Sequence, residues 1–402
     1  MVVGCCAKTL TFHQGEIVSA LLVFTACFNH GSGTPISMIP IYTLQPKFEV
    51  LASAFLSPWF RTFESEDYVD FGLFDEWKEE GRRRFLLSDD PAAARFHVLY
   101  EDWRSLNRSE EGRAHIKAAV DLSLRSEKQL VIFCGGDQNE RIDWPENAAV
   151  FRFALRKSEK AKNELSTPIF HRDHLRDFSG EGVFSAKDKS QLPLIAFCGY
   201  APPFKTPFDL QKLKDWAKLM GVACGRIDAS GGRAAHAVRA IALMRLMRSK
   251  KTLKPNFIIR EKFGFNNKWG ILQPGGSRQS AQQQRREFAN NILESDYSLC
   301  VRGLANCSIR LYETMSLGRI PLVLDTDCVY PCDSLIDWES VGPFADRGDL
   351  WNVPELINRF HQNIDDEGFV ELQERNRGIW EKYLCPTGFF SHIPQLIASL
   401  PK

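Results

Sequence analysis

Two arginines, a serine and a glutamate lie close together in the last third of the chain. Arg302 follows an apolar run at residues 297–301, and Ser308, Arg310 and Glu313 follow within the next eleven residues. Guanidinium groups donate paired hydrogen bonds to phosphate oxygens, and a helix N-terminus favours negative charge. A carboxylate on the same helix face can accept two hydrogen bonds from a ribose diol. These side chains therefore predict a site for the diphosphate and ribose of a nucleotide.

A strand–helix–strand pattern positions these residues. Residues 297–301 predict a buried strand, residues 308–317 a helix that Gly318 ends, and residues 320–324 a second buried strand. Gly303 lies in the first turn. Such a βαβ unit places polar residues at the carboxyl end of a parallel strand, where open α/β sheets bind nucleotides.

The order and spacing of these residues resemble the C-terminal signature of the exostosin-like glycosyltransferases. The matched positions are LCxRG at 299–303, SxRxxE at 308–313, GxIPxV at 318–323, Pro331 and IDW at 336–338. The similarity extends from about residue 288 to 396 and fades upstream.

The resemblance implies an α/β protein with the GT-B fold, in which two Rossmann-like domains face a central cleft. It also implies transfer of a sugar from a nucleoside diphosphate donor to a glycan or polysaccharide acceptor, with inversion and without a tightly bound metal. A UDP-sugar is the favoured co-substrate, and no other cofactor is expected. On this resemblance, Arg302 and Arg310 stabilise the departing diphosphate and Glu313 holds the ribose. Ser308 caps the helix or donates to a phosphate.

Two residues upstream are further candidates for donor binding. Gly199 follows a predicted strand at residues 195–198, where it either lets a phosphate approach the backbone or serves as an ordinary turn glycine. Arg260 ends a predicted strand at residues 256–259. In a parallel sheet it would share the edge of Arg302; a solvated arginine at a strand end is the alternative.

The base that activates the acceptor hydroxyl is expected in the first domain, on a carboxylate or histidine. Asp137 follows a predicted strand at residues 129–133 and is the first candidate, and Asp173 is the second. Glu164 and His171 are rivals, and for each aspartate a turn or cap is the alternative role. Residues 325–327 (DTD) resemble a metal-binding DxD motif, but we interpret them as a polar loop after a strand and expect no metal site.

The length and composition favour a globular protein of two domains. The chain has 402 residues, a net charge of +1 and 11 cysteines, so neither a nucleic-acid partner nor a disulfide framework is expected. No sequence pattern assigns residues 1–47 to a domain. We assign residues 48–185 to an acceptor-side domain and residues 190–390 to a nucleotide-sugar domain. Residues 391–402 are predicted as a helix that could pack back on the first domain. Residues 48–125 are predicted as mostly helical.

The N-terminal segment predicts no firm membrane anchor. Its apolar run at residues 17–28 has 12 residues and follows Glu16, whereas a membrane span needs about 20. We therefore expect a cytoplasmic enzyme of bacterial or viral type rather than one of the Golgi lumen. Two other functions stay open: a catalytically silent nucleotide-sugar-binding subunit, in a homo- or hetero-dimer, or another α/β group-transfer enzyme.

Overall fold

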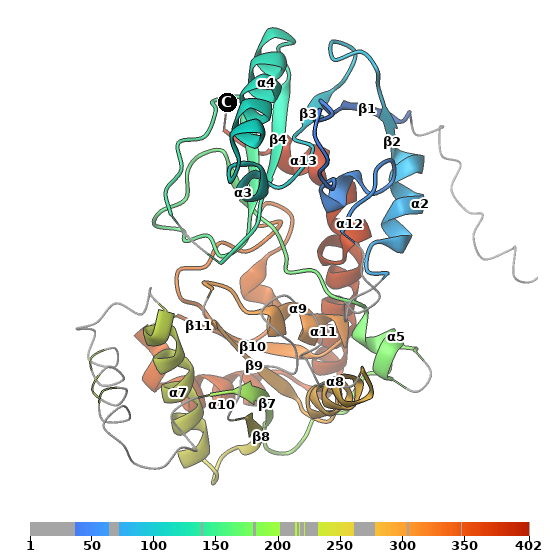
Figure 1. Ribbon diagram of the computed structural model, residues 1–402. Helices are drawn as coiled ribbons and strands as arrows, with labels where there is room; N and C mark the ends of the chain where they lie inside the picture. Colours follow the sequence, from blue (N-terminus) through green and yellow to red (C-terminus); the bar gives the residue numbers. More distant parts are fainter. Residues whose placement is uncertain are drawn as a thin grey trace, which may run out of the picture. The chain divides into compact units, whose positions relative to one another are not determined.

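Two parallel β-sheets with flanking helices form the described structure (Figure 1). The computed structural model describes residues 37–63, 72–137, 140–179, 182–201, 214, 217, 221, 232–260, 278–303, 305–346 and 348–401. Both sheets lie within one compact unit, Ile39–Lys402. The fold class is therefore α/β with two Rossmann-like sheets, as predicted for the GT-B architecture.

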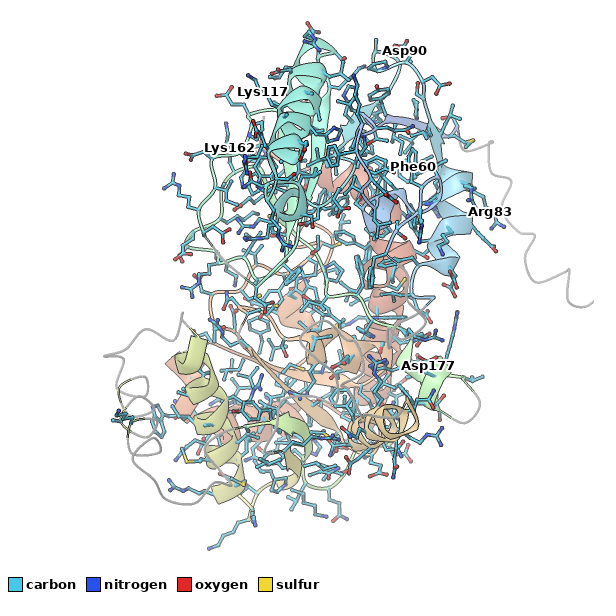
Figure 2. All side chains as sticks on the ribbon, viewed as in Figure 1. Phe60, Arg83, Asp90, Lys117, Lys162 and Asp177 are labelled. Carbon is cyan, nitrogen blue, oxygen red and sulfur yellow. The ribbon has the colours of Figure 1, made fainter. Side chains whose placement is uncertain are left out.

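The first sheet has the strand order β2-β1-β3-β4-β5-β6 in the part of the chain that is described. Its strands are β1 (Ile39–Tyr42), β2 (Phe85–Leu87), β3 (Phe96–Val98), β4 (Gln129–Cys134), β5 (Ala148–Arg152) and β6 (Glu164–Ser166). The helices of this half are α2 (Asp75–Arg84), α3 (Trp103–Leu106), α4 (Glu110–Arg125) and α5 (His174–Phe178). Charged side chains of these helices, such as Arg83 and Lys117, and Asp90 in the loop after β2 are exposed (Figure 2).

The prediction of a mostly helical region at residues 48–125 is wrong in part, because β2 and β3 lie within it. Strand β1 was also missed; it pairs with both of them and lies in the segment 1–47 that no pattern assigned. These strands have three or four residues each, which is too short to show the alternation of a strand. Strand β4 confirms the strand predicted at residues 129–133. The apolar run at residues 148–153 also predicts a strand, which β5 confirms.

The second sheet has the order β11-β10-β9-β7-β8 among the described residues. Its strands are β7 (Leu194–Tyr200), β8 (Lys254–Arg260), β9 (Tyr297–Val301), β10 (Ile320–Leu324) and β11 (Phe344–Ala345). Every residue of β9 and β10 is buried, as expected for central parallel strands covered on both faces. Helices α7 (Gly232–Arg248), α8 (Arg278–Leu293), α9 (Ile309–Ser316), α10 (Val353–Asn363) and α11 (Asp366–Ile379) complete this half.

The glycine, asparagine, glutamine and serine content of residues 264–284 predicts a surface loop. This prediction is wrong from Arg278 onward, where α8 begins. Glutamine and alanine favour that helix, but they show no apolar periodicity. The sequence also predicts a strand at residues 221–227, which lies outside the described residues except for Gly221, which is helical.

The C-terminal helices α12 (Pro386–Ser391) and α13 (Ile393–Ala398) pack against the core of the first sheet. The Phe390 ring lies 5.6 Å from that of Phe55 and 5.2 Å from that of Trp77, between ring centroids. Helix α12 contacts α2. The chain therefore builds the second sheet and then returns to the first. In the part of the chain that is described, no helix combines the length and apolar character needed to cross a bilayer.

Gly318 ends α9 in a left-handed backbone conformation, with a φ of +61°, which glycine adopts without strain. A Cβ atom there would lie 2.2 Å from the Phe184 ring. We expect Gly318→Ala to lower the free energy of unfolding by at least about 1 kcal/mol, because the strained backbone and the collision add together. Urea denaturation measures this change.

Gly378 provides the matched control for that substitution. It lies inside α11, and a Cβ atom there would meet no atom within 4 Å. Gly378→Ala should stabilise the protein by about 0.5–1 kcal/mol, because alanine loses less backbone entropy in a helix. Equal effects of the two substitutions would contradict the role assigned to Gly318.

Candidate functional site

The candidate site lies at the carboxyl edge of the second sheet, where the strand order reverses. From β7 the chain adds β8 on one side, and β9 then lies on the other side of β7. Such a switch point leaves a crevice at the carboxyl ends of the two strands, which is where open α/β sheets bind ligands. Gly199 lies in β7 and Arg302 directly follows β9, so both predicted residues border this point.

Three buried arginines meet at the switch point. Arg310, in the first turn of α9, donates from Nη2 to the carbonyl oxygen of Cys198 at 2.6 Å. Arg302 donates to Oδ1 of Asn306 at 3.0 Å. Arg239, in α7, donates to the carbonyl oxygen of Arg302 at 3.0 Å and so joins α7 to the end of β9.

Of these three guanidinium groups, those of Arg239 and Arg310 donate to neutral carbonyl oxygens. Their exposed fractions are 8% for Arg239, 4% for Arg302 and 9% for Arg310. Burial, together with the charge of Arg310, lowers the pKa of Arg239 to about 9. Buried cations are costly unless an anion accompanies them. The cluster is therefore chemically suited to an anionic ligand.

Two glycines of the predicted site make room for this cluster. A Cβ atom on Gly199 would lie 2.9 Å from Nη2 of Arg310, and one on Gly303 would lie 3.3 Å from Nη2 of Arg239. The close neighbour of the Gly199 backbone is thus a guanidinium group. From the sequence, a phosphate or a plain turn was expected at this position, and not an arginine.

Ser308 occupies the N-cap position of α9, but its side chain makes no capping hydrogen bond in the described structure. The first turn of the helix carries no acidic residue. Backbone N–H groups at such a helix start favour an anion. Both roles predicted for Ser308, as a cap or as a phosphate donor, stay predictions.

Glu313 lies on the next turn of α9 and meets a histidine of the first half of the chain. Its Oε1 lies 3.4 Å from Nε2 of His174. Burial would raise the pKa of Glu313, but the hydrogen bond and charge of His174, with the charges of His171 and Arg310, lower it below its ordinary value. Glu313 is therefore held as a carboxylate, which is the form that accepts hydrogen bonds from a ribose diol.

Arg260 ends β8, which is parallel to β7, so it shares the carboxyl edge with the switch point. Its Nη2 lies 2.5 Å from Oε2 of Glu287, and its Nη1 donates to Gln284 at 2.8 Å. This ion pair occupies the Arg260 guanidinium in the structure. A direct contact of Arg260 with a phosphate stays a prediction that requires the pair with Glu287 to rearrange.

Asp325 and Asp327 of the DxD-like segment contact the first half of the chain. Asp325 accepts a hydrogen bond from Nζ of Lys157 at 2.9 Å, and Asp327 accepts one from the hydroxyl of Ser158 at 2.5 Å. No group of three or more potential metal ligands occurs among the described residues. These carboxylates hold the loop after β10 against the loop after β5.

The loops after β5 and β9 bring the carboxyl edges of the two sheets together. Asn306, which accepts from Arg302, donates to the carbonyl oxygen of Leu155 at 3.2 Å. Burial, with the charge of Asp137, raises the pKa of the Cys307 thiol to about 12. The exposed candidate base Asp137 is therefore near enough to Cys307 for its charge to act there, and no described contact tests its catalytic role.

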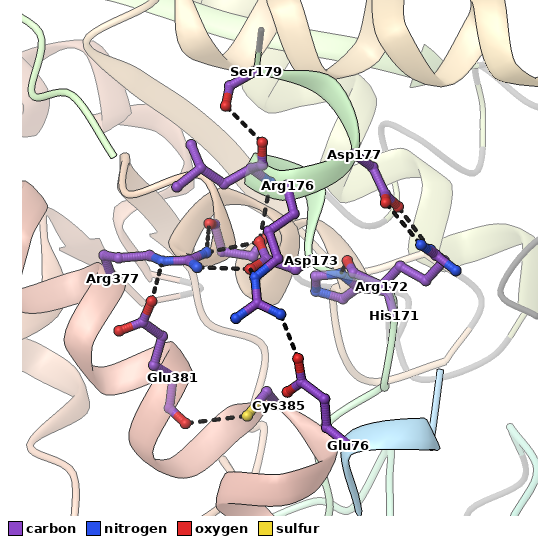
Figure 3. A network of polar contacts seen from close by, with 12 residues as sticks. Glu76, His171, Arg172, Asp173, Arg176, Asp177, Ser179, Arg377, Glu381 and Cys385 are labelled. Atoms are coloured by element: carbon purple, nitrogen blue, oxygen red, sulfur yellow. Dashed lines mark hydrogen bonds and ion pairs between the residues drawn. The ribbon is translucent and has the colours of Figure 1, made fainter. Parts of the chain in front are cut away.

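Asp173, the second candidate base, lies in a network of ion pairs (Figure 3). Its carboxylate accepts two hydrogen bonds from Arg377, at 2.8 and 2.7 Å, and caps α5 through the N–H of Leu175 at 3.1 Å. Burial opposes the charge, but the hydrogen bonds and charge of Arg377 outweigh it and lower the pKa of Asp173. A general base needs a pKa nearer neutrality. The geometry thus favours a structural role, and a catalytic one stays a prediction.

Replacing Asp173 by asparagine should lower the free energy of unfolding at pH 7 by about 1.5–3 kcal/mol, because asparagine still caps α5 but cannot neutralise Arg377. Since the folded pKa of Asp173 lies below 3.8, this stabilisation is complete above that value and is lost as the pH falls through the folded pKa. Urea denaturation from pH 3 to 8 should show the wild-type advantage shrinking only in acid.

The exposed cap Asp365 provides a control for that experiment. It caps α11 through the N–H of Gly368 at 2.8 Å. Asp365→Asn should change stability by less than about 0.5 kcal/mol, because aspartate and asparagine cap equally well. A difference for Asp173→Asn that stayed constant down to pH 3 would contradict the assigned ion pair.

The described structure therefore defines a protein with two Rossmann-like sheets and a buried arginine cluster at the switch point of the second. Its sequence is similar to an exostosin-1 homologue of Caenorhabditis elegans, with 28% identity over 134 residues. It is also similar to exostosin-1 of Drosophila melanogaster, with 28% identity over 116 residues. A rice protein named as a probable glucuronosyltransferase is 30% identical over 79 residues. The chain is thus exostosin-like, which confirms the predicted resemblance.

These similarities cover only part of each protein. They span 33%, 29% and 20% of this chain, and 34%, 15% and 18% of the lengths of the three relatives. No protein-family model matches the chain. A solved glycosyltransferase structure from Rickettsia africae aligns over 90% of this chain and 99% of that one, with 7% identity and a TM-score of 0.34. So weak a match adds nothing to the fold assignment, which rests on the two parallel sheets.

Proposed function

We propose that this protein transfers a sugar from a nucleoside diphosphate donor to a hydroxyl group of a glycan or polysaccharide acceptor. The observation that carries this proposal is the buried cluster of Arg239, Arg302 and Arg310, in which Arg239 and Arg310 donate to neutral carbonyl oxygens. The diphosphate of the donor would supply the negative charge that these buried cations need. The similarity to exostosins and to a probable glucuronosyltransferase supports the same activity, and a UDP-sugar is the donor we expect.

The proposed mechanism is a direct displacement that inverts the anomeric carbon. The acceptor oxygen bonds to that carbon while the bond to the phosphate oxygen breaks, and the electron pair leaves on the diphosphate. Negative charge therefore grows on the leaving group, where we expect Arg302, Arg310 and the N-terminus of α9 to stabilise it. These groups would perform the role that a divalent cation has in other transferases, while Glu313 would hold the ribose.

Donor binding at Arg302 requires a local opening. The cavity that Arg302 and Ser308 line measures about 20 Å³, which suits a water molecule rather than a nucleotide. The hydrogen bond of Asn306 with Leu155 closes this region from the side of the first sheet. We therefore propose that the loop carrying Asn306 separates from Leu155 when the donor enters and returns afterwards, which would exclude water during transfer.

A thermal-shift panel tests the proposed function. Wild-type protein is heated with UDP, GDP, CDP and their common sugars, each with and without EDTA. We expect one nucleoside diphosphate class to raise the melting temperature and EDTA to leave that rise unchanged; a ligand at 100 times its Kd stabilises by about 2.7 kcal/mol. The absence of any shift would contradict the donor site. A shift lost in EDTA would contradict metal-free binding and direct attention to Asp325 and Asp327.

A further inference from the structure

A second pocket lies at the carboxyl edge of the first sheet, and the donor site does not use it. It measures about 420 Å³. The strand order of this sheet reverses at β1, because β2 lies on one side of β1 and β3 on the other. The pocket lies near this switch point. Glu101, three residues beyond the end of β3, lines the pocket together with Gly135, which follows β4. By the same topological rule as for the donor site, this crevice is a binding site.

Two adjacent carboxylates in this pocket have different surroundings. Asp102 accepts hydrogen bonds from the N–H groups of Arg104, Ser105 and Gly135, at 2.9, 3.2 and 2.5 Å, so it is committed to holding α3 against β4. Glu101 accepts one hydrogen bond, from the N–H of Asp102 at 3.1 Å. Among the described residues, no lysine, arginine or histidine forms an ion pair with Glu101. Glu101 is therefore the carboxylate with hydrogen-bonding capacity to spare.

The pocket also tunes the acidity of Glu101. Burial raises its pKa to about 7; the charge of Asp102 adds to this shift and the N–H of Asp102 opposes it. Cys134 is the remaining titratable group among the lining residues that are described, and burial raises its pKa to about 11. Near neutral pH, only Glu101 therefore combines a perturbed pKa with spare acceptor capacity, which is the property of a general base.

The lining of the pocket suits a sugar ring. Eight of its lining residues are phenylalanines, including Phe74, Phe133 and Phe170. The electron-rich face of such a ring attracts the C–H groups on the apolar face of a pyranose. Ser53 adds a polar group: its side chain is 8% exposed, and its hydroxyl has no hydrogen-bond partner in the described structure. A buried hydroxyl without a partner is rare unless a ligand satisfies it.

The pocket and the donor site involve residues that are close together in the sequence. Phe153, another lining residue, is two positions before Leu155, whose carbonyl accepts from Asn306 next to Arg302. We infer that this pocket binds the terminal sugar of the acceptor and that Glu101 takes the proton from its attacking hydroxyl. This inference rests on the proposed function. The proton moves to Glu101 as the new bond to the anomeric carbon forms, the diphosphate leaves with its electron pair, and Glu101 then returns the proton to solvent.

The test compares full-length wild type with Glu101→Gln, using the donor found in the thermal-shift panel and p-nitrophenyl glycosides of common hexoses and pentoses as acceptors. We expect kcat to fall about 10²- to 10⁴-fold while the donor-induced thermal shift is unchanged. Wild-type kcat/KM should rise with pH through an apparent pKa near 7, and the residual activity of the variant should lose this step. Folding is not at risk, because the neutral side chain is favoured in this pocket.

Two further variants make the test decisive. Ser53→Ala should raise KM for the acceptor without lowering stability, because nothing in the described structure bonds to that hydroxyl. Glu146→Gln, an exposed position before β5, should match wild type. Full activity of Glu101→Gln, or loss of activity only in Asp137→Asn, would overturn the inference while the donor site stands. A wild type that binds no nucleotide sugar would instead refute the proposed function, and the inference with it.

Discussion

Replacing Arg302 by alanine should lower kcat/KM about 10²- to 10³-fold and remove most of the thermal shift caused by the donor. Removal of one preorganised donor from a site that stabilises a developing negative charge has an effect of this size. Arg302 directly follows β9 at the switch point, and Asn306 holds its guanidinium in place through the hydrogen bond at 3.0 Å.

Two other variants separate charge from geometry. Arg302→Lys keeps the positive charge but loses the fork that binds two phosphate oxygens, so it should retain only part of the affinity. Arg319→Lys is the control, because Arg319 is also buried but lies just before β10, at the opposite edge of the sheet. Each donor-induced shift is compared with the melting temperature of the same variant without ligand. Unchanged donor binding by Arg302→Ala would contradict the assigned site.

The largest stability effect is expected from Phe389→Ala, at about 3–5 kcal/mol. Phe389 is fully buried, and its ring lies 5.8 Å from that of Phe151 in β5 and 5.7 Å from that of Phe170. Truncation would leave a cavity where α12 docks on the first sheet. Helix α12 belongs to the last part of the chain, so this contact ties the C-terminal end to the core of the first half.

Urea denaturation monitored by circular dichroism measures the effect of Phe389→Ala. Leu124→Ala is the control; that leucine is 53% exposed on α4 and should change stability by less than about 0.5 kcal/mol. Phe389→Leu should fall between the two, because it keeps part of the buried surface. A change below 1 kcal/mol for Phe389→Ala would contradict the docking of α12 against the first sheet.

The second sheet could be predicted well from the sequence for a physical reason. Central parallel strands are buried on both faces, so β9 and β10 appear as continuous apolar runs between polar turns. The edge of such strands then locates Arg302, and the helix spacing places Arg310 beside it. The structure brings both arginines to the switch point, while their contact with a diphosphate stays a prediction.

The first sheet and its pocket could not be predicted in the same way. Strands of three or four residues, such as β1 and β3, carry too few positions to show a period. Without β3, nothing in the sequence distinguishes Glu101 from other surface carboxylates. Arg239 was missed for a different reason. It is one of the charged residues that lie among the alanines and leucines of α7. Only the parallel pairing of β7 with β9 brings it to the ends of both strands. The sequence signal that could have found it is a charged residue on the apolar face of a helix.

Crystallography of the protein with the nucleoside diphosphate selected by the thermal-shift panel tests the central claim most directly. The account predicts density for the two phosphates at the carboxyl ends of β7 and β9, with phosphate oxygens within hydrogen-bond distance of the Arg302 guanidinium and the first N–H groups of α9. Density for the diphosphate elsewhere, for example beside Glu101 in the pocket of the first sheet, with the bond from Arg302 to Asn306 unchanged, would contradict it.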